Sequence, residues 1–172
     1  MGTVSDLVID RLIEWDLHRF CGFPGDGAGG FDGALRRGES AGKDFTYTRP
    51  THEEMAALMR CAHVKFTGEV GVCVATSGPG AVHLMDGLYD ADCSNQPVVA
   101  VVGQQARAAM GSDFQRELNM ERLFDDVAEF VKGLTTPTQS QMVVDEALRT
   151  AEAYRKPTRA DRRTIGHLRG CL

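Results

Sequence analysis

An apolar run that ends in a glycine-rich turn sets the architecture of this chain. Residues Val70–Ala75 are almost continuously apolar and include three valines, which is typical of a strand covered on both faces of a parallel sheet. The apolar run is then interrupted by Ser77-Gly78-Pro79-Gly80, and a helical pattern of apolar residues begins at Ala81. A strand, a glycine turn and a helix in this order place backbone N–H groups at the carboxyl edge of a sheet. Taken alone, the segment does not distinguish a ligand site from an ordinary βα turn.

A second helix is predicted to begin near Glu53. Thr51 and Glu54 have the spacing of a capping box, which predicts a structural role for Glu54. Four apolar residues then recur on one helical face, as in a helix packed on a sheet: Met55, Met59, Ala62 and Phe66. Glu53 lies in the first turn, where the helix dipole stabilises a negative charge by roughly 0.3 to 1 kcal/mol. Its position alone favours an ordinary acidic residue in water over a functional one.

Strands and helices alternate along the rest of the chain. The further predicted elements are a helix over Val4–Asp16, strands over Arg19–Phe23 and Phe45–Thr48, the end of a short helix at Ala34–Arg37, a strand over Val98–Val102, a short helix and strand within Met120–Phe130, and a helix over Gln141–Tyr154. This order predicts an α/β fold, with a doubly wound parallel sheet and helices on both faces. The 172 residues, 42% of them hydrophobic, are enough for one core and one domain.

Six segments of the chain, taken together, resemble the pyrimidine-binding domain of thiamine diphosphate enzymes, in particular the pyruvate oxidase and acetolactate synthase group. In chain order, they are Phe23-Pro24-Gly25-Asp26-Gly27, His52-Glu53-Glu54, Thr76-Ser77-Gly78-Pro79-Gly80, Gly87-Leu88-Tyr89-Asp90-Ala91, Gln96-Pro97-Val98-Val99-Ala100-Val101 and Phe114-Gln115. The resemblance is continuous over about residues 4 to 157. It implies a domain that contacts the pyrimidine half of thiamine diphosphate, in an enzyme that acts on a 2-keto acid such as pyruvate.

The resemblance implies a catalytic role for Glu53. In the family, the glutamate at this position hydrogen-bonds a ring nitrogen of the aminopyrimidine and so promotes removal of the thiazolium proton. The cofactor then acts as the electron sink of the reaction. The other cofactor-binding residues that the resemblance implies are Gly25, Thr76, Ser77, Gly78, Pro79, Gly80 and His83.

Two further features of the resemblance concern the substrate. Phe114 and Gln115 are similar to the aromatic and amide pair on the loop that covers the substrate in the family. A histidine at the position of His83 is typical of pyruvate oxidases, whereas acetolactate synthases more often have asparagine there. These matches favour a pocket for pyruvate.

No metal site is predicted in this chain. Gly25-Asp26-Gly27 looks like the start of the family's Mg-diphosphate motif, which ends at an asparagine roughly thirty residues later. The first asparagine here is Asn95, so an oxygen ligand that Mg²⁺ needs is missing. The resemblance implies that Mg²⁺, and FAD in members that hold a flavin, are bound through other domains.

The composition changes at the carboxyl end. Residues 155–172 carry six basic side chains and one acidic one, although the whole chain has a net charge of −5. The family continues after Lys156-Pro157-Thr158 with an apolar strand, but the sequence here is polar. It predicts a domain over 1–157 that lacks its last strand, followed by a disordered basic tail over 158–172. A frameshift or altered gene end is the leading explanation, and a basic tail that binds nucleic acid or an acidic partner is the weaker one.

Cysteine content and hydropathy bear on where the protein works. The five cysteines have no metal-ligand spacing, which predicts reduced thiols: Cys21, Cys61, Cys73, Cys93 and Cys171. No apolar run has the length of a secretory signal or a membrane span. We therefore expect a cytoplasmic protein without membrane or nucleic-acid partners.

Three functional hypotheses follow from the sequence. The first is the pyrimidine-binding domain of a pyruvate-processing enzyme, truncated and inactive alone, which forms homo-oligomers and needs a diphosphate-binding domain from another chain or from a missing carboxyl-terminal part. The second is a complete small subunit of a two-chain 2-keto acid decarboxylase. The third is a non-catalytic binding module that has kept the fold.

Overall fold

The computed structural model describes residues 2–106, 108–134 and 136–163, with side chains described up to Thr158. Its strands are β1 (Arg19–Gly22), β2 (Thr46–Thr48), β3 (Gly71–Ala75), β4 (Val98–Gln104), β5 (Phe130–Leu134) and β6 (Thr158–Arg163). Its helices are α1 (Val4–Glu14), α2 (Gly29–Ser40), α3 (Glu53–Thr67), α4 (Pro79–His83), α5 (Met85–Cys93), α6 (Met120–Phe124) and α7 (Pro137–Tyr154), and a 3-10 turn, η1 (Asp26–Ala28), precedes α2. None of the helices in these ranges has the length and hydrophobicity needed to cross a bilayer.

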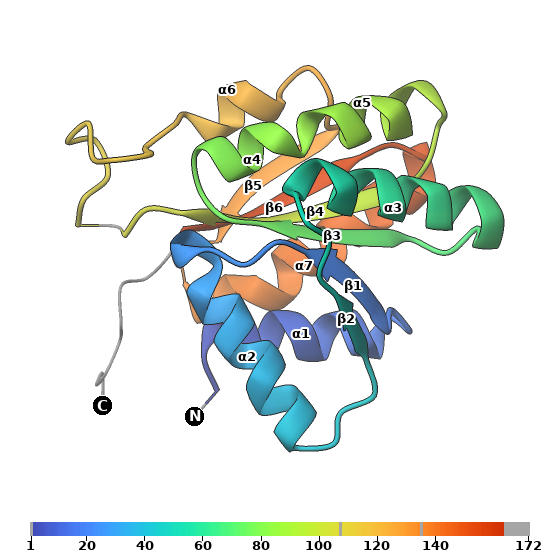
Figure 1. The fold of residues 1–172 in the computed structure, drawn as a ribbon, viewed down its shortest axis with the longest axis horizontal. Helices are drawn as coiled ribbons and strands as arrows, with labels where there is room; N and C mark the ends of the chain where they lie inside the picture. Colours follow the sequence, from blue (N-terminus) through green and yellow to red (C-terminus); the bar gives the residue numbers. More distant parts are fainter. Residues whose placement is uncertain (1, 107, 135, 164–172) are drawn as a thin grey trace.

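All the strands in the described ranges pair in parallel, in the order β2-β1-β3-β4-β6-β5. Helices α1, α2 and α7 lie on one face of the sheet, and α3 to α6 lie on the other (Figure 1). This arrangement confirms the predicted α/β fold with helices on both faces.

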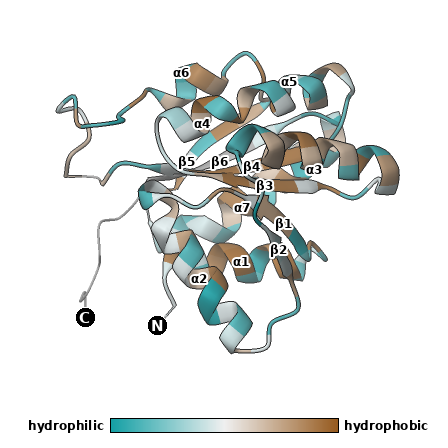
Figure 2. Ribbon diagram, in the orientation of Figure 1, coloured by the Kyte–Doolittle hydropathy of each residue, from teal (hydrophilic) through white to brown (hydrophobic). Residues whose placement is uncertain are grey.

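The central strands β3 and β4 are buried along their whole length. In β3, Val72 and Val74 pack into the core beneath α1, α2 and α7, whereas Cys73 and Ala75 pack into the core beneath α3 and α5. Successive side chains of a strand point to opposite faces, so both cores draw on the same strand. Figure 2 shows the hydrophobic residues gathered on the sheet and on the helix faces turned toward it. The continuous apolar run is therefore explained by cover on both faces, as predicted.

The strand order determines where a ligand can bind. The chain leaves β1 toward β2 on one side and later enters β3 on the other side of β1. In doubly wound sheets, ligands bind beyond the carboxyl ends of the strands at the point where the connections diverge in this way. The loops that follow β1 and β3 meet at this point.

The prediction that the last strand is missing is wrong. Strand β6 lies between β4 and β5, and Thr158 is in register with Val99 on one side and Phe130 on the other. Thr158 is fully buried, and its hydroxyl donates to the carbonyl of Ala147 in α7 at 3.0 Å. Hydropathy alone misjudged this segment because a strand ladder is made by backbone groups, which any sequence except proline supplies. The sheet therefore continues past residue 157, to Arg163, and residues 164–172 of the predicted tail lie outside the described residues.

The first turn of α3 also differs from the prediction. His52 is the N-cap and no side chain caps the helix, so Thr51 and Glu54 form no capping box. The predicted apolar stripe is wrong as well, because Met55 is 44% exposed and Phe66 is 91% exposed. The buried face consists of Glu53, Ala56, Ala57, Arg60, Cys61 and Val64.

A close approach between α3 and α5 explains why this buried face has a small residue at Ala57. A Cβ atom on Gly87 would lie 2.5 Å from the Cβ of Ala57 and 2.5 Å from the backbone nitrogen of Leu58. Backbone atoms cannot move aside, so only glycine allows the two helices to come this near. This contact fixes the position of α3, the helix that begins with Glu53, against α5.

Replacement of Gly87 by alanine should therefore lower the free energy of unfolding by about 1 to 3 kcal/mol, the usual cost of overpacking. Gly29→Ala, in the first turn of α2, is the matched control because a Cβ there would have no neighbour within 4 Å. It should leave the free energy of unfolding unchanged or raise it by up to about 1 kcal/mol. Urea unfolding followed by circular dichroism measures both variants, and equal effects of the two would contradict the close approach.

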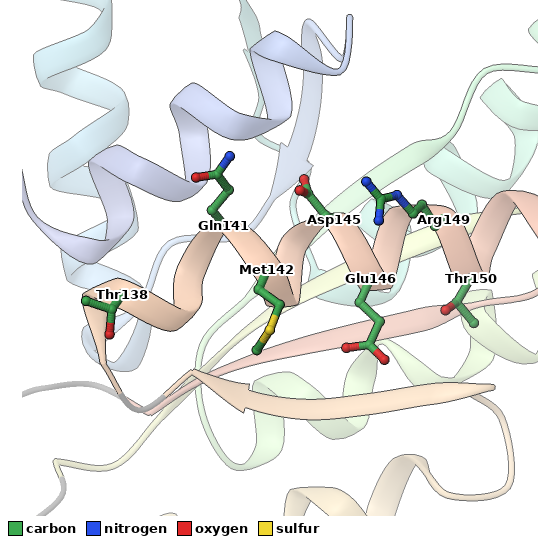
Figure 3. Close-up of a pocket in the computed structure, with 7 residues that line it drawn as sticks. All are labelled: Thr138, Gln141, Met142, Asp145, Glu146, Arg149 and Thr150. Carbon is green, nitrogen blue, oxygen red and sulfur yellow. The ribbon is translucent and has the colours of Figure 1, made fainter.

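Helix α7 is joined to α1 through Asp145. Its carboxylate accepts hydrogen bonds from Arg11 at 2.6 and 2.9 Å and from the indole nitrogen of Trp15 at 2.9 Å. Figure 3 shows Asp145 pointing toward α1, whereas Met142 and Glu146 point away from it. The Arg11 guanidinium holds the pKa of Asp145 below its ordinary value.

Asp145→Asn should lower the free energy of unfolding at pH 7 by about 1 to 2 kcal/mol, because charge-assisted hydrogen bonds are lost. A depressed pKa in the folded state stabilises the protein above the unfolded-state pKa of about 3.9, and this contribution is lost as the pH falls through the folded-state pKa. The difference in the free energy of unfolding between wild type and variant should therefore shrink below about pH 4 in urea titrations.

Asp10→Asn is the control. It breaks an exposed ion pair with Lys43 and should change the free energy of unfolding by less than about 1 kcal/mol. A constant difference from pH 3 to pH 7 would contradict this account of Asp145.

Candidate functional site

Two loops touch at the carboxyl edge of the sheet. A Cβ atom on Gly25, which follows β1, would lie 2.7 Å from the Cβ of Thr76, which follows β3. The backbone N–H of Gly27 donates to Oγ1 of Thr76 at 2.9 Å. Glycine at position 25 thus lets the loop after β1 approach the loop after β3, and the hydrogen bond to Thr76 links the two loops.

The Glu53 carboxylate is buried against the second of these loops. Glu53 is 7% exposed, so the reading of it as an ordinary acid in water is wrong. A Cβ on Gly80 would lie 3.0 Å from Oε1 of Glu53 and 2.5 Å from Cγ2 of Thr76. Gly78 has a φ of +66°, which lets the chain turn sharply from β3 into α4. Glycine at position 80 therefore leaves bare backbone beside the carboxylate.

Two histidines flank this carboxylate. Nδ1 of His83, the last residue of α4, lies 3.1 Å from Oε2 of Glu53. Nε2 of His52 lies 3.9 Å from the same oxygen, and the two imidazole rings face each other with their centroids 4.4 Å apart. Both histidine side chains are nearly half exposed. The other carboxylate oxygen, Oε1, has no hydrogen-bond partner among the described residues.

Phe114 and Gln115 lie on the other side of the glycine turn. A Cβ on Gly78 would lie 2.7 Å from the Cβ of Arg116, so this segment runs directly along the turn. Phe114 is 52% exposed. The segment helps to line a cavity of about 320 Å³, whose residues are Asp26, Gly27, Ser77, Gln104, Gln105, Ala106, Phe114, Gln115 and Arg116.

The sequence-predicted site residues thus fall into two neighbouring groups. Gly25, Thr76, Gly78, Gly80, Glu53 and His83 gather around the turn after β3, and Pro79 occupies the first position of α4. Phe114 and Gln115 share the adjoining cavity with Ser77, and Glu53 is not among the residues that line it. The turn after β3 lies between the two groups and contacts both of them.

Sequence reasoning missed two residues of this region. His52 entered only as part of a matched segment, although its place directly before Glu53 could have drawn attention to it. Gln105 follows β4, and its side-chain amide donates to Oγ of Ser77 at 3.2 Å and to the carbonyl of Gln115 at 2.9 Å. A polar residue directly after a buried parallel strand is the signal that could have identified it.

A second hollow, of about 550 Å³, lies along α7 on the opposite face of the sheet from α3 (Figure 3). Its lining residues come from this one helix: Thr138, Gln141, Met142, Asp145, Glu146, Arg149 and Thr150. It brings together no group of buried polar side chains comparable to the one around Glu53.

Known proteins resemble this chain over most of its length. It is 38% identical over 149 residues to a putative thiamine pyrophosphate-containing protein of Bacillus subtilis, covering 87% of this chain and 25% of the relative. It is 36% identical over 148 residues to the pyruvate oxidase of Lactiplantibacillus plantarum, covering 86% and 24%. It is 32% identical over 153 residues to the acetolactate synthase of Arthrospira platensis, covering 89% and 26%. The chain thus spans about a quarter of the length of these relatives.

The family assignment rests on most of the chain. Residues 2–127 match the model of the thiamine pyrophosphate enzyme, N-terminal TPP binding domain. This range contains α1 to α6 and β1 to β4, and hence both loops that meet at the carboxyl edge of the sheet. The chain belongs to the thiamine pyrophosphate enzyme family and carries its N-terminal TPP binding domain.

Proposed function

We propose that this chain supplies the pyrimidine side of a thiamine diphosphate site and that Glu53 is its catalytic residue. The observation that carries the proposal is the largely buried Glu53 carboxylate, whose Oε1 faces the bare backbone of Gly80 while Oε2 contacts His83. Oε1 is therefore the oxygen left for a ligand. A ring nitrogen of the aminopyrimidine would share a proton with it.

The surroundings of Glu53 fit a flat ring with polar edges. Gly80 leaves a cradle of bare backbone beside Oε1, and Gly25 lets the loop after β1 lie directly against Thr76. The backbone of such a turn offers N–H and C=O groups for the edge of a ring. Gly25, Thr76, Ser77, Gly78, Pro79, Gly80 and His83 are the residues that would hold it.

When bound, thiamine diphosphate supplies the carbanion chemistry and the electron sink for reactions at the carbonyl carbon of a 2-keto acid. Glu53 would hold a proton at the ring nitrogen, acting as a positioned acid and base. His83 contacts Oε2 and so keeps Oε1 turned toward the cradle. Burial of the carboxylate excludes competing water from this proton.

We propose pyruvate, or a similar 2-keto acid, as the substrate. The proposal is supported by the relatives named pyruvate oxidase and acetolactate synthase and by the histidine at position 83. Phe114 and Gln115 would lie on the substrate side, because they line the cavity that adjoins the turn after β3. Gln105 would hold this segment against Ser77.

The diphosphate, with its Mg²⁺ and any flavin, would be held by a further domain. In support of this, Gly25-Asp26-Gly27 is engaged in loop contacts with Thr76 and Ser77. That further domain would come from another subunit or from another part of a longer protein. A homo-oligomer in which domains of two subunits complete one site is the assembly we propose.

The full chain should bind thiamine, which carries the aminopyrimidine without the diphosphate, at millimolar concentrations. Amide shifts in NMR spectra should change at His52, Glu53, Gly78 and Gly80. Glu53→Gln keeps the size of the side chain but cannot accept the proton, so it should weaken binding about tenfold, or about 1.4 kcal/mol.

The matched control is Glu69→Gln, because Glu69 lies just beyond the other end of α3 and is 62% exposed beside His63. This variant should bind thiamine as wild type does. Equal affinity of wild type and Glu53→Gln, or shifts confined to another surface, would contradict the proposed role of Glu53.

A further inference from the structure

The residues around Glu53 also form a donor set for a metal ion. One ring nitrogen each from His52 and His83 and one oxygen of Glu53 lie within 4.8 Å of one another. From Oε2 of Glu53, the nitrogens of His83 and His52 are 3.1 and 3.9 Å away. Donors bound tetrahedrally at 2.0–2.1 Å from one ion lie about 3.3 Å apart. Small side-chain movements would therefore bring all three donors around one ion.

We propose that His52, Glu53 and His83 bind a divalent late transition-metal cation, with Zn²⁺ as the expected occupant. Two imidazoles and one carboxylate form a donor set that zinc prefers, and they leave a fourth position open for water or a ligand. Mg²⁺ is disfavoured because it takes oxygen ligands in near-octahedral order. No such site was predicted from the sequence, because the three residues are brought together by folding.

The positions of the three side chains suit this role. Glu53 is buried at the start of α3, and His83 ends α4, so both sit at defined helix ends. The side chain of His52 is 45% exposed and can rotate without disturbing the core. The negative charge of the carboxylate attracts a cation.

A cation bound here would hinder binding at the proposed cofactor site, because the two sites share Glu53 and His83. The cation would take the carboxylate that the proposed function assigns to the aminopyrimidine, so Zn²⁺ and thiamine would compete. This consequence rests on the proposed function, whereas the binding of the metal does not.

Titration calorimetry of the full chain with ZnCl₂, and with MgCl₂ in parallel, tests the proposal. Zn²⁺ should bind and Mg²⁺ should not. His83→Gln and His52→Gln should each weaken Zn²⁺ binding at least about tenfold, because loss of a direct ligand costs no less than loss of an outer hydrogen-bond partner. Co²⁺ should give the intense visible absorption of a four-coordinate ion, and both variants should lose it.

His63→Gln is the matched control, since His63 lies elsewhere on α3 and pairs with Glu69 beyond the end of that helix, and it should keep wild-type affinity for Zn²⁺. Cys93→Ser removes an exposed thiol and should also keep it. Wild-type affinity in both His52→Gln and His83→Gln, or loss of binding in Cys93→Ser alone, would overturn the metal site. Zinc binding that needs both histidines but is unaffected by thiamine would support the metal site and contradict the proposed contact of Glu53 with the pyrimidine.

Discussion

The burial of one carboxylate is the constraint on which this site depends. A carboxylate removed from water is costly unless it is paired or hydrogen-bonded, and Glu53 meets this cost in part through the first turn of α3 and the nearby nitrogen of His83. The tight packing of α3 on α5 at Gly87 keeps the carboxylate in place. If Glu53 binds the cofactor as proposed, its carboxylate would already be in position before the ligand arrives, which would reduce the ordering that binding requires.

The sheet determines what surrounds this carboxylate. Because β1 and β3 are parallel neighbours, the loops that follow them emerge at the same edge, and Thr76 can bond to Gly27 across a large separation in sequence. The turn after β3 then serves two regions. One of its sides faces Glu53 and the two histidines, and the other adjoins the cavity lined by Phe114 and Gln115. Cofactor and substrate contacts would therefore be coupled through a few glycine residues.

The sequence was most informative where local pattern and tertiary environment agree. Val70–Ala75 was recognised as a strand because both of its faces are covered. The buried face of α3 was misjudged because the close approach at Gly87 involves a different helix. Strand β6 was missed because its pairing uses backbone groups, and Gln105 was missed because its partners, Ser77 and Gln115, are distant in sequence. Position alone did not reveal the burial of Glu53, whereas the family resemblance singled this residue out.

The most direct test of the central claim is a crystal structure of the chain with thiamine bound. The account predicts that the aminopyrimidine lies against the turn formed by Thr76 to Gly80, with a ring nitrogen at hydrogen-bonding distance, about 2.6 to 3.2 Å, from the Glu53 carboxylate. A ring bound elsewhere, or a ring in this crevice that makes no hydrogen bond to Glu53, would contradict it.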